Sequence, residues 1–158
     1  MSADRIRIET EYLPKLWGKI LYVGIADHTM SYGSLTPQTS VWHTIDVDPT
    51  LRDRKAAKHF VGDFLELEFK EKYEHVSLYG LWGSPHSCTN DTEEIKLALE
   101  KAHQLLNDGG TMMVGPRWRN NILTKKQCHD IFSFLSGKGY KTLFERAVGS
   151  NVIYWGKK

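Results

Sequence analysis

Small and acidic residues follow three short apolar runs of the chain, where they could form a nucleoside site. Gly24 and Ala26 are small enough for the backbone to approach a ligand closely. Asp46 lies 22 positions after Gly24, close to the ~20 expected for an acidic residue that accepts hydrogen bonds from a ribose diol. Farther along, Asp63 offers an acceptor for an exocyclic amine and Phe64 offers a ring that could pack on a purine. We therefore predict that these three loops converge on one nucleoside.

A fourth loop carries the best candidate for proton transfer. It begins at Gly80 and contains His86, whose type of side chain has a pKa of ~6.5 and suits acid–base chemistry near neutral pH. His28, in the loop after Gly24, is a weaker second candidate. We predict that His86 is the catalytic base if the reaction needs one.

Strands and helices alternate along the chain and would bring these loops together. Five apolar runs predict strands over residues 19–24, 41–47, 59–62, 75–80 and 111–114, and two β-like runs over 141–148 and 151–155 predict a hairpin. Helical spacing and caps predict a leading helix over 9–17, a short basic helix over 49–58, and two longer helices from Asp91 to Gly109-Gly110 and from Thr124 to Gly137. The fold class is therefore α/β, a doubly wound, mostly parallel sheet with a C-terminal antiparallel hairpin, and ligands of such sheets lie at the carboxyl ends of the strands.

The motifs in this order resemble those of class I S-adenosylmethionine-dependent methyltransferases. The likeness rests on four stretches: residues 20–26 for the first motif, 43–49 for the acidic motif of the second strand, 61–64 for the third motif and 102–111 for the helix, turn and strand after the fourth. It spans most of the chain, and it implies one Rossmann-like core over residues 19–158 behind a leading helix over 1–18. The resemblance implies S-adenosylmethionine as the cofactor and no metal.

The same resemblance assigns cofactor contacts to named positions. Residues around the methionine part would be Gly24, Ile25 and Ala26, those at the ribose Asp46 and Val47, and those at the adenine Asp63 and Phe64, with Gly80 beside the cofactor after the fourth strand. The fourth loop lacks the Asn/Asp-Pro-Pro-Tyr signature of amino-methylating DNA enzymes, and the Lys-Asp-Lys-Glu set of ribose 2′-O RNA methyltransferases is not recognisable. The subfamily therefore stays open.

Composition excludes several classes of protein. The chain has 158 residues, 41% of them hydrophobic and 25% charged, which fits one ordered globular domain. It holds two cysteines, Cys88 and Cys128, without metal-type spacing, and it has no apolar run long enough for a membrane span and no signal peptide. We expect a cytoplasmic protein that does not bind membranes and has free thiols.

The motifs and the composition are compatible with three functions. The first is a methyltransferase for a small-molecule or sugar-like acceptor, whose acceptor site is open or completed by a second subunit in a homodimer. The second is a catalytically inactive, methyltransferase-like binding or regulatory subunit, favoured by Ala26 in place of the usual second glycine. The third is a nucleic-acid methyltransferase, because residues 117–158 hold 9 Lys or Arg and 2 Asp or Glu, a net charge of +7. A nicotinamide-dependent oxidoreductase is least favoured, since the glycine fingerprint for the dinucleotide phosphates is incomplete.

Overall fold

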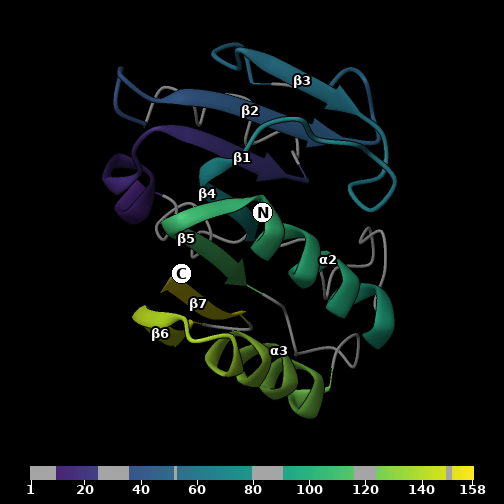
Figure 1. Cartoon of the computed structure of the whole chain (residues 1–158), viewed down its shortest axis with the longest axis vertical. Helices are drawn as coiled ribbons and strands as arrows, with labels where there is room; N and C mark the ends of the chain where they lie inside the picture. The colour runs from purple at the N-terminus through teal and green to yellow at the C-terminus, as the bar shows by residue number, and fades with distance from the viewer. Residues whose placement is uncertain (1–9, 25–35, 52, 80–90, 116–123, 149–150) are drawn as a thin grey trace.

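Seven strands form a single sheet in the computed structural model, which describes residues 10–24, 36–51, 53–79, 91–115, 124–148 and 151–158 (Figure 1). The strands are β1 (Lys19–Val23), β2 (Val41–Asp46), β3 (Lys58–Val61), β4 (Tyr73–Tyr79), β5 (Leu106–Gly115), β6 (Lys141–Val148) and β7 (Asn151–Lys157). The helices are the 3₁₀ helix η1 (Leu13–Lys15) and the α-helices α2 (Thr92–Leu105) and α3 (Lys125–Gly137).

The strand order is β3-β2-β1-β4-β5-β7-β6. Strands β1 to β5 are parallel to one another, and β7 runs antiparallel to both β5 and β6. The expected doubly wound sheet with a C-terminal hairpin is therefore confirmed. The order reverses between β1 and β4, the point at which sheets of this kind bind ligands beyond the carboxyl ends of the strands.

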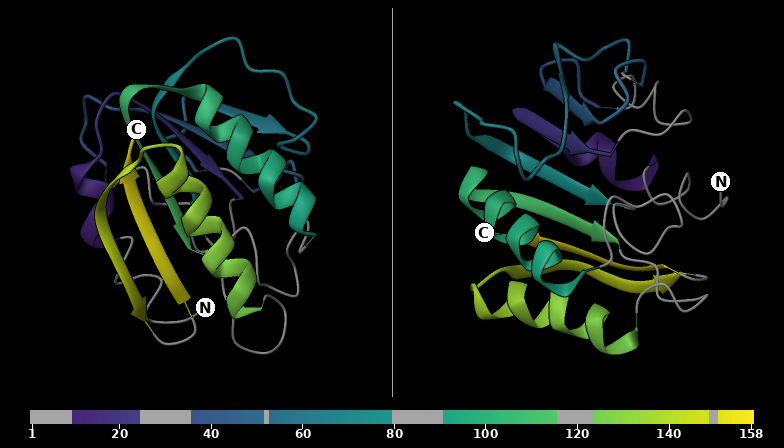
Figure 2. Two further views of the ribbon diagram at one scale, coloured as in Figure 1. Left: turned by 60° about the horizontal axis from the view of Figure 1, so that its bottom comes forward. Right: turned by 90° about the vertical axis from the view of Figure 1, so that its right-hand side faces the viewer.

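Helices α2 and α3 lie side by side on one face of the sheet (Figure 2). Both begin at the caps that the sequence predicts: the Asp91 carboxylate accepts hydrogen bonds from two backbone N–H groups, and Thr124 forms a reciprocal capping box with Gln127. The apolar sides of the two helices pack on side chains such as Leu21, Val76 and Met112 in the larger hydrophobic core.

The opposite face is covered by the N-terminal segment in the part of the chain that is described. Tyr12, Leu13 and Leu16 pack there on buried strand residues that include Trp42 and Trp155. The leading helix expected over 9–17 is shorter than predicted, because helical structure in the described residues ends at Lys15 and Leu16 is extended.

Buried polar groups also lie on this second face. His75 of β4 is fully buried, and its ring Nδ1 lies 2.7 Å from the hydroxyl oxygen of Thr111 on β5. Burial lowers the pKa of His75 to about 3, so the ring is neutral at physiological pH.

The prediction of a short basic helix over 49–58 is wrong, because residues 49–51 and 53–57 contain no helix, with turns at 49–50 and 54–55, and Lys58 already begins β3. Two aspartates explain the difference. The carboxylate of Asp48 accepts a hydrogen bond from the backbone of Thr50, and that of Asp53 accepts one from the backbone of Lys55. Such local bonds replace helical ones and favour turns.

The end of α2 also differs from the prediction. Gly109-Gly110 was expected to end the helix, yet α2 stops at Leu105 and Leu106 is already extended as the first residue of β5. Leu106 pairs with Tyr73 at the start of β4, so strand pairing begins before the glycines are reached.

Among the helices that the structure describes, none combines the length and the apolar character that a membrane span requires.

Candidate functional site

Gly24 forms the turn at the carboxyl end of β1. Its φ of 79° lies in the left-handed region that favours glycine, and its N–H donates a hydrogen bond of 2.9 Å to the carbonyl oxygen of Ile45 on β2. Gly24 thus adopts this conformation without strain and adds no side chain at the end of the strand. The predicted contacts Ile25 and Ala26, which follow directly, lie outside the described residues.

Asp46 is the last residue of β2, the strand beside β1. One carboxylate oxygen accepts a hydrogen bond of 2.9 Å from the N–H of Asp48, which orients the side chain. Partial burial, and to a smaller extent the charge of Asp48, raise the pKa of Asp46 above its ordinary value, while hydrogen bonds and His59 act in the opposite direction. Val47 follows with 60% of its side chain exposed, beyond the end of the strand.

Asp63 lies just after β3, the next strand of the sheet. Gly62 precedes it with a φ of 144°, and its N–H donates to the carbonyl oxygen of Asp46 at 3.0 Å, so the two acidic loops are joined through the backbone. One carboxylate oxygen of Asp63 accepts the N–H of Leu65 at 2.8 Å. No described residue hydrogen-bonds to its other oxygen, which is therefore available to an amine donor.

Phe64 follows Asp63 and is almost entirely buried. Its side chain is only 5% exposed and belongs to the larger core, with the ring of Phe69 at 5.8 Å between centroids and the ammonium group of Lys101 at 5.4 Å. Protein side chains therefore occupy most of the surface that was expected to stack on a purine. A contact of Phe64 with adenine remains a prediction, and it would involve the backbone or the ring edge.

The structure thus brings Gly24, Asp46 and Asp63 to the ends of three adjacent parallel strands. The predicted base His86, the weaker candidate His28 and the predicted cofactor contact Gly80 lie outside the described residues.

One neighbour of Asp46, His59, is not predicted from the sequence. His59 on β3 lies directly opposite Thr44 on β2, and its Nδ1 is 2.8 Å from the Thr44 hydroxyl oxygen. The other ring nitrogen, Nε2, is buried and has no hydrogen-bond partner among the described residues. The register of β3 on β2 places this ring two residues before the end of the two strands, and the sequence alone does not give that register.

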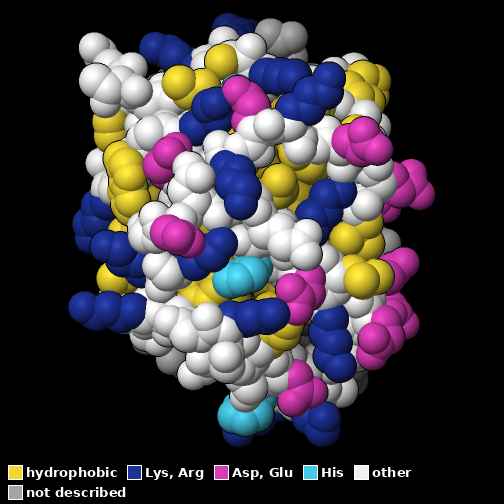
Figure 3. Space-filling view, viewed as in Figure 1, with side chains coloured by type: hydrophobic (Ala, Val, Ile, Leu, Met, Phe, Trp, Pro, Cys, Tyr) yellow, Lys and Arg dark blue, Asp and Glu magenta, His cyan; other side chains and the backbone are white. Residues whose placement is uncertain are grey.

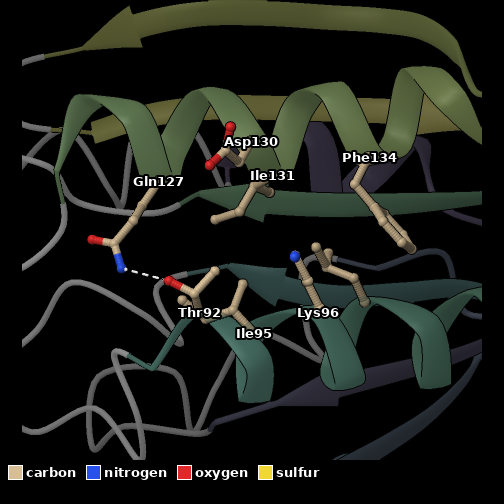
Figure 4. A pocket seen from close by; sticks show the side chains of 8 residues that line it. Thr92, Ile95, Lys96, Gln127, Asp130, Ile131 and Phe134 are labelled. Atoms are coloured by element: carbon tan, nitrogen blue, oxygen red, sulfur yellow. Dashed lines mark hydrogen bonds between the residues drawn. The ribbon is translucent and has the colours of Figure 1, made fainter.

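A shallow groove lies between α2 and α3 (Figure 4). Ile95 and Ile131 line it, and at one end the side-chain amide of Gln127 donates to the hydroxyl of Thr92 at 3.1 Å. This groove is the junction of two packed helices on the face of the sheet, and it is separate from the site formed by Gly24, Asp46 and Asp63.

Comparison with solved structures identifies the fold. The N-methyltransferase NodS from Bradyrhizobium japonicum WM9 superposes with a TM-score of 0.72 at 11% sequence identity, over 98% of this chain and 94% of NodS. Its complex with S-adenosyl-L-homocysteine gives 0.73 at 13% identity, over 98% of this chain and 86% of that one. This chain has the fold of S-adenosylmethionine-dependent methyltransferases.

Other solved structures match with similar TM-scores and sequence identities. The fibrillarin pre-rRNA processing protein of Methanococcus jannaschii has a TM-score of 0.62 and 15% identity, over 89% of this chain and 66% of that one. An O-methyltransferase family protein from Burkholderia thailandensis gives 0.67 and 14%, over 98% of this chain and 55% of that one. No protein-family model and no curated protein matches the sequence. These identities establish the fold and leave the acceptor open.

Proposed function

We propose that the protein is a methyltransferase that uses S-adenosylmethionine. The observation that carries the proposal is the convergence of Gly24, Asp46 and Asp63 at the ends of β1, β2 and β3, in a sheet with the methyltransferase fold. The donor set fits the cofactor: Gly24 leaves room for the methionine part, Asp46 accepts from the ribose hydroxyls, and Asp63 accepts from the adenine amine.

The bound cofactor supplies a methyl group already activated by the sulfonium sulfur. The chain then has mainly to hold an acceptor atom in line with that group, and such alignment can account for much of the rate increase. We assign His86 as the base that removes a proton where the acceptor is a hydroxyl, and Gly80 as a cofactor contact after β4. The His86 assignment rests on its place in the loop after the fourth strand and on the ordinary pKa of histidine, and the Gly80 assignment rests on the resemblance of the sequence to this class.

We propose a small-molecule or sugar-like acceptor. Charge supports this class: Asp63, Asp91, Glu93 and Glu94 are exposed at the described part of the edge on which the strands end, and the exposed Lys125 and Lys126 at the start of α3 offset only part of their charge. Figure 3 shows Asp and Glu side chains gathered mainly along that side, while Lys and Arg are more frequent along the side on which the strands begin. An acidic edge repels a nucleic-acid backbone, so a polyanionic acceptor is the second candidate, supported by the +7 charge of residues 117–158.

Calorimetric titration with S-adenosylmethionine and S-adenosylhomocysteine tests the cofactor site. The informative pair of variants is Asp46→Asn and Asp48→Asn, at two neighbouring positions. Each variant removes one negative charge and keeps a side-chain oxygen that can accept the backbone hydrogen bond of Asp48 or of Thr50, respectively. Hydrogen bonds to a charged group contribute about 1.5–3 kcal/mol, so Asp46→Asn should weaken binding at least tenfold, by about 1.4 kcal/mol or more. Asp48→Asn should bind as the wild type does.

Equal losses in the two variants would contradict the ribose assignment, and a wild type that binds neither compound would contradict the cofactor. Transfer of a labelled methyl group to a panel of hydroxylated and amino compounds, with RNA and DNA in parallel, then separates the acceptor classes. Cofactor binding without transfer to any of them would favour the regulatory-subunit alternative. Sedimentation with and without cofactor tests the homodimer that we also propose.

A further inference from the structure

Lys101 of α2 connects that helix to the loop after β3. Its ammonium group donates hydrogen bonds to the carbonyl oxygens of Leu65 at 3.1 Å and Leu67 at 2.5 Å. It also lies over the rings of Phe64 and Phe69, 5.4 and 5.3 Å from their centroids. One cation therefore contacts four residues of a segment that lies more than 30 positions away in the sequence.

The segment that Lys101 holds is the turn that begins at Asp63. The carbonyl oxygen of Asp63 accepts hydrogen bonds from the N–H groups of Glu66 and Leu67, each at 3.0 Å, and its carboxylate accepts the N–H of Leu65. Asp63 thus accepts hydrogen bonds from the N–H groups of residues 65–67. The carbonyl oxygens of Leu65 and Leu67 in the same segment accept from Lys101, so Asp63 and Lys101 hold the turn together.

The side chain has the character of a structural cation rather than of a solvated surface lysine. Lys101 is partly buried, and this burial lowers its pKa, while the charges of Asp63 and Glu68 act in the opposite direction. Without an ammonium group the carbonyl oxygens of Leu65 and Leu67 would lose this donor, which is costly for partly buried polar groups. The turn would then relax and carry the Asp63 carboxylate with it.

We propose that Lys101 is a positioning residue of the adenine subsite: it fixes the turn that presents the free carboxylate oxygen of Asp63 to the exocyclic amine of the base. This inference rests on the proposed cofactor. Lys101 would thus affect base selectivity through the position of Asp63.

The test compares two ligands in calorimetric titration: S-adenosylhomocysteine and the analogue in which hypoxanthine replaces adenine, S-inosylhomocysteine. The analogue has a carbonyl where adenine has its amine, so it places an acceptor against the Asp63 carboxylate. Wild-type protein should prefer the adenine compound by at least about tenfold, since a charge-assisted hydrogen bond is lost with the analogue.

Lys101→Met keeps the length of the side chain and removes its charge. In this variant the preference should fall below about threefold, chiefly through weaker binding of the adenine compound, and Lys101→Arg should restore most of it. The matched control is Lys96→Met on the same helix, whose amine contacts only Glu93 at 3.6 Å among the described interactions and which should keep the full preference.

The outcomes separate the two proposals. A wild type that binds neither ligand overturns the cofactor and the positioning role together. A wild type that discriminates, with an unchanged preference in Lys101→Met, overturns the positioning role alone. If Lys101→Met is unfolded by circular dichroism, Lys101→Gln, which keeps one amide donor, takes its place and must give an intermediate preference. A uniform loss of affinity for both ligands would mark Lys101 as structural only and would also overturn the proposal.

Discussion

Acid should destabilise the protein through His75, and the size of the effect follows from its burial. The ring is fully buried beside Thr111 and its pKa is about 3, whereas a histidine of the unfolded chain has a pKa of about 6.5. Between these two values the unfolded chain binds a proton that the folded protein does not. The free energy of unfolding therefore falls as the pH is lowered from about 6.5 towards 3, by about 2 kcal/mol at pH 5 relative to pH 8.

The double variant His75→Phe with Thr111→Val isolates this contribution. Phenylalanine keeps a ring next to Tyr12, whose ring centroid lies 6.0 Å from that of His75, and valine removes the hydroxyl that would lose its partner. Urea unfolding followed by tryptophan fluorescence gives the free energy of unfolding of both proteins at pH 8, 6.5 and 5. The wild type should lose about 2 kcal/mol more than the double variant between the two extremes.

Other histidines do not confuse this comparison. Burial also lowers the pKa of His43 and His103, but both titrate in wild type and variant alike and cancel in the difference. The single variant His75→Phe should in addition lose about 1–3 kcal/mol at pH 8, since the buried Thr111 hydroxyl is left unpaired. Parallel pH curves for wild type and double variant would refute the reasoning.

Two further predictions concern the site and α3. Burial raises the pKa of Asp46 above the ordinary value of an aspartate, which is near 4. The affinity for S-adenosylhomocysteine should therefore fall as the pH is lowered through the pKa of Asp46. Calorimetric titrations from pH 8 to 4.5 should show this fall in the wild type and not in Asp46→Asn. Thr124→Ala removes the hydroxyl of the α3 capping box and should cost about 1 kcal/mol, or about 2–4 °C in melting temperature, whereas Thr124→Ser should cost much less; equal losses in the two variants would contradict the role of the hydroxyl.

Local signals allowed much of the fold to be predicted from the sequence. The caps at Asp91 and Thr124 and the helical stripe from Ile95 to Leu105 need only neighbouring residues to be recognised, and both helices begin where they are predicted to begin. The segment over 49–58 has no such stripe, since Leu51 and Ala56 are the residues there that pack against the core and they lie five positions apart. With little apolar surface to bury on one helical face, the side-chain bonds of Asp48 and Asp53 decide its structure.

The same distinction applies to the site. Asp46 and Asp63 could be placed because one ends a strand and the other lies two residues after the next strand, and adjacent parallel strands bring such positions to one edge. The side chains that lie near these two aspartates come from elsewhere in the structure. The register of β3 on β2 brings His59 near Asp46, and the packing of α2 on the loop after β3 brings Lys101 near Asp63. Neither position belongs to a motif, because a motif records residues close in sequence while these contacts depend on packing. Chain order therefore allows candidate cofactor contacts to be predicted in such a fold, whereas the side chains that pack around those candidates become known only from the folded structure.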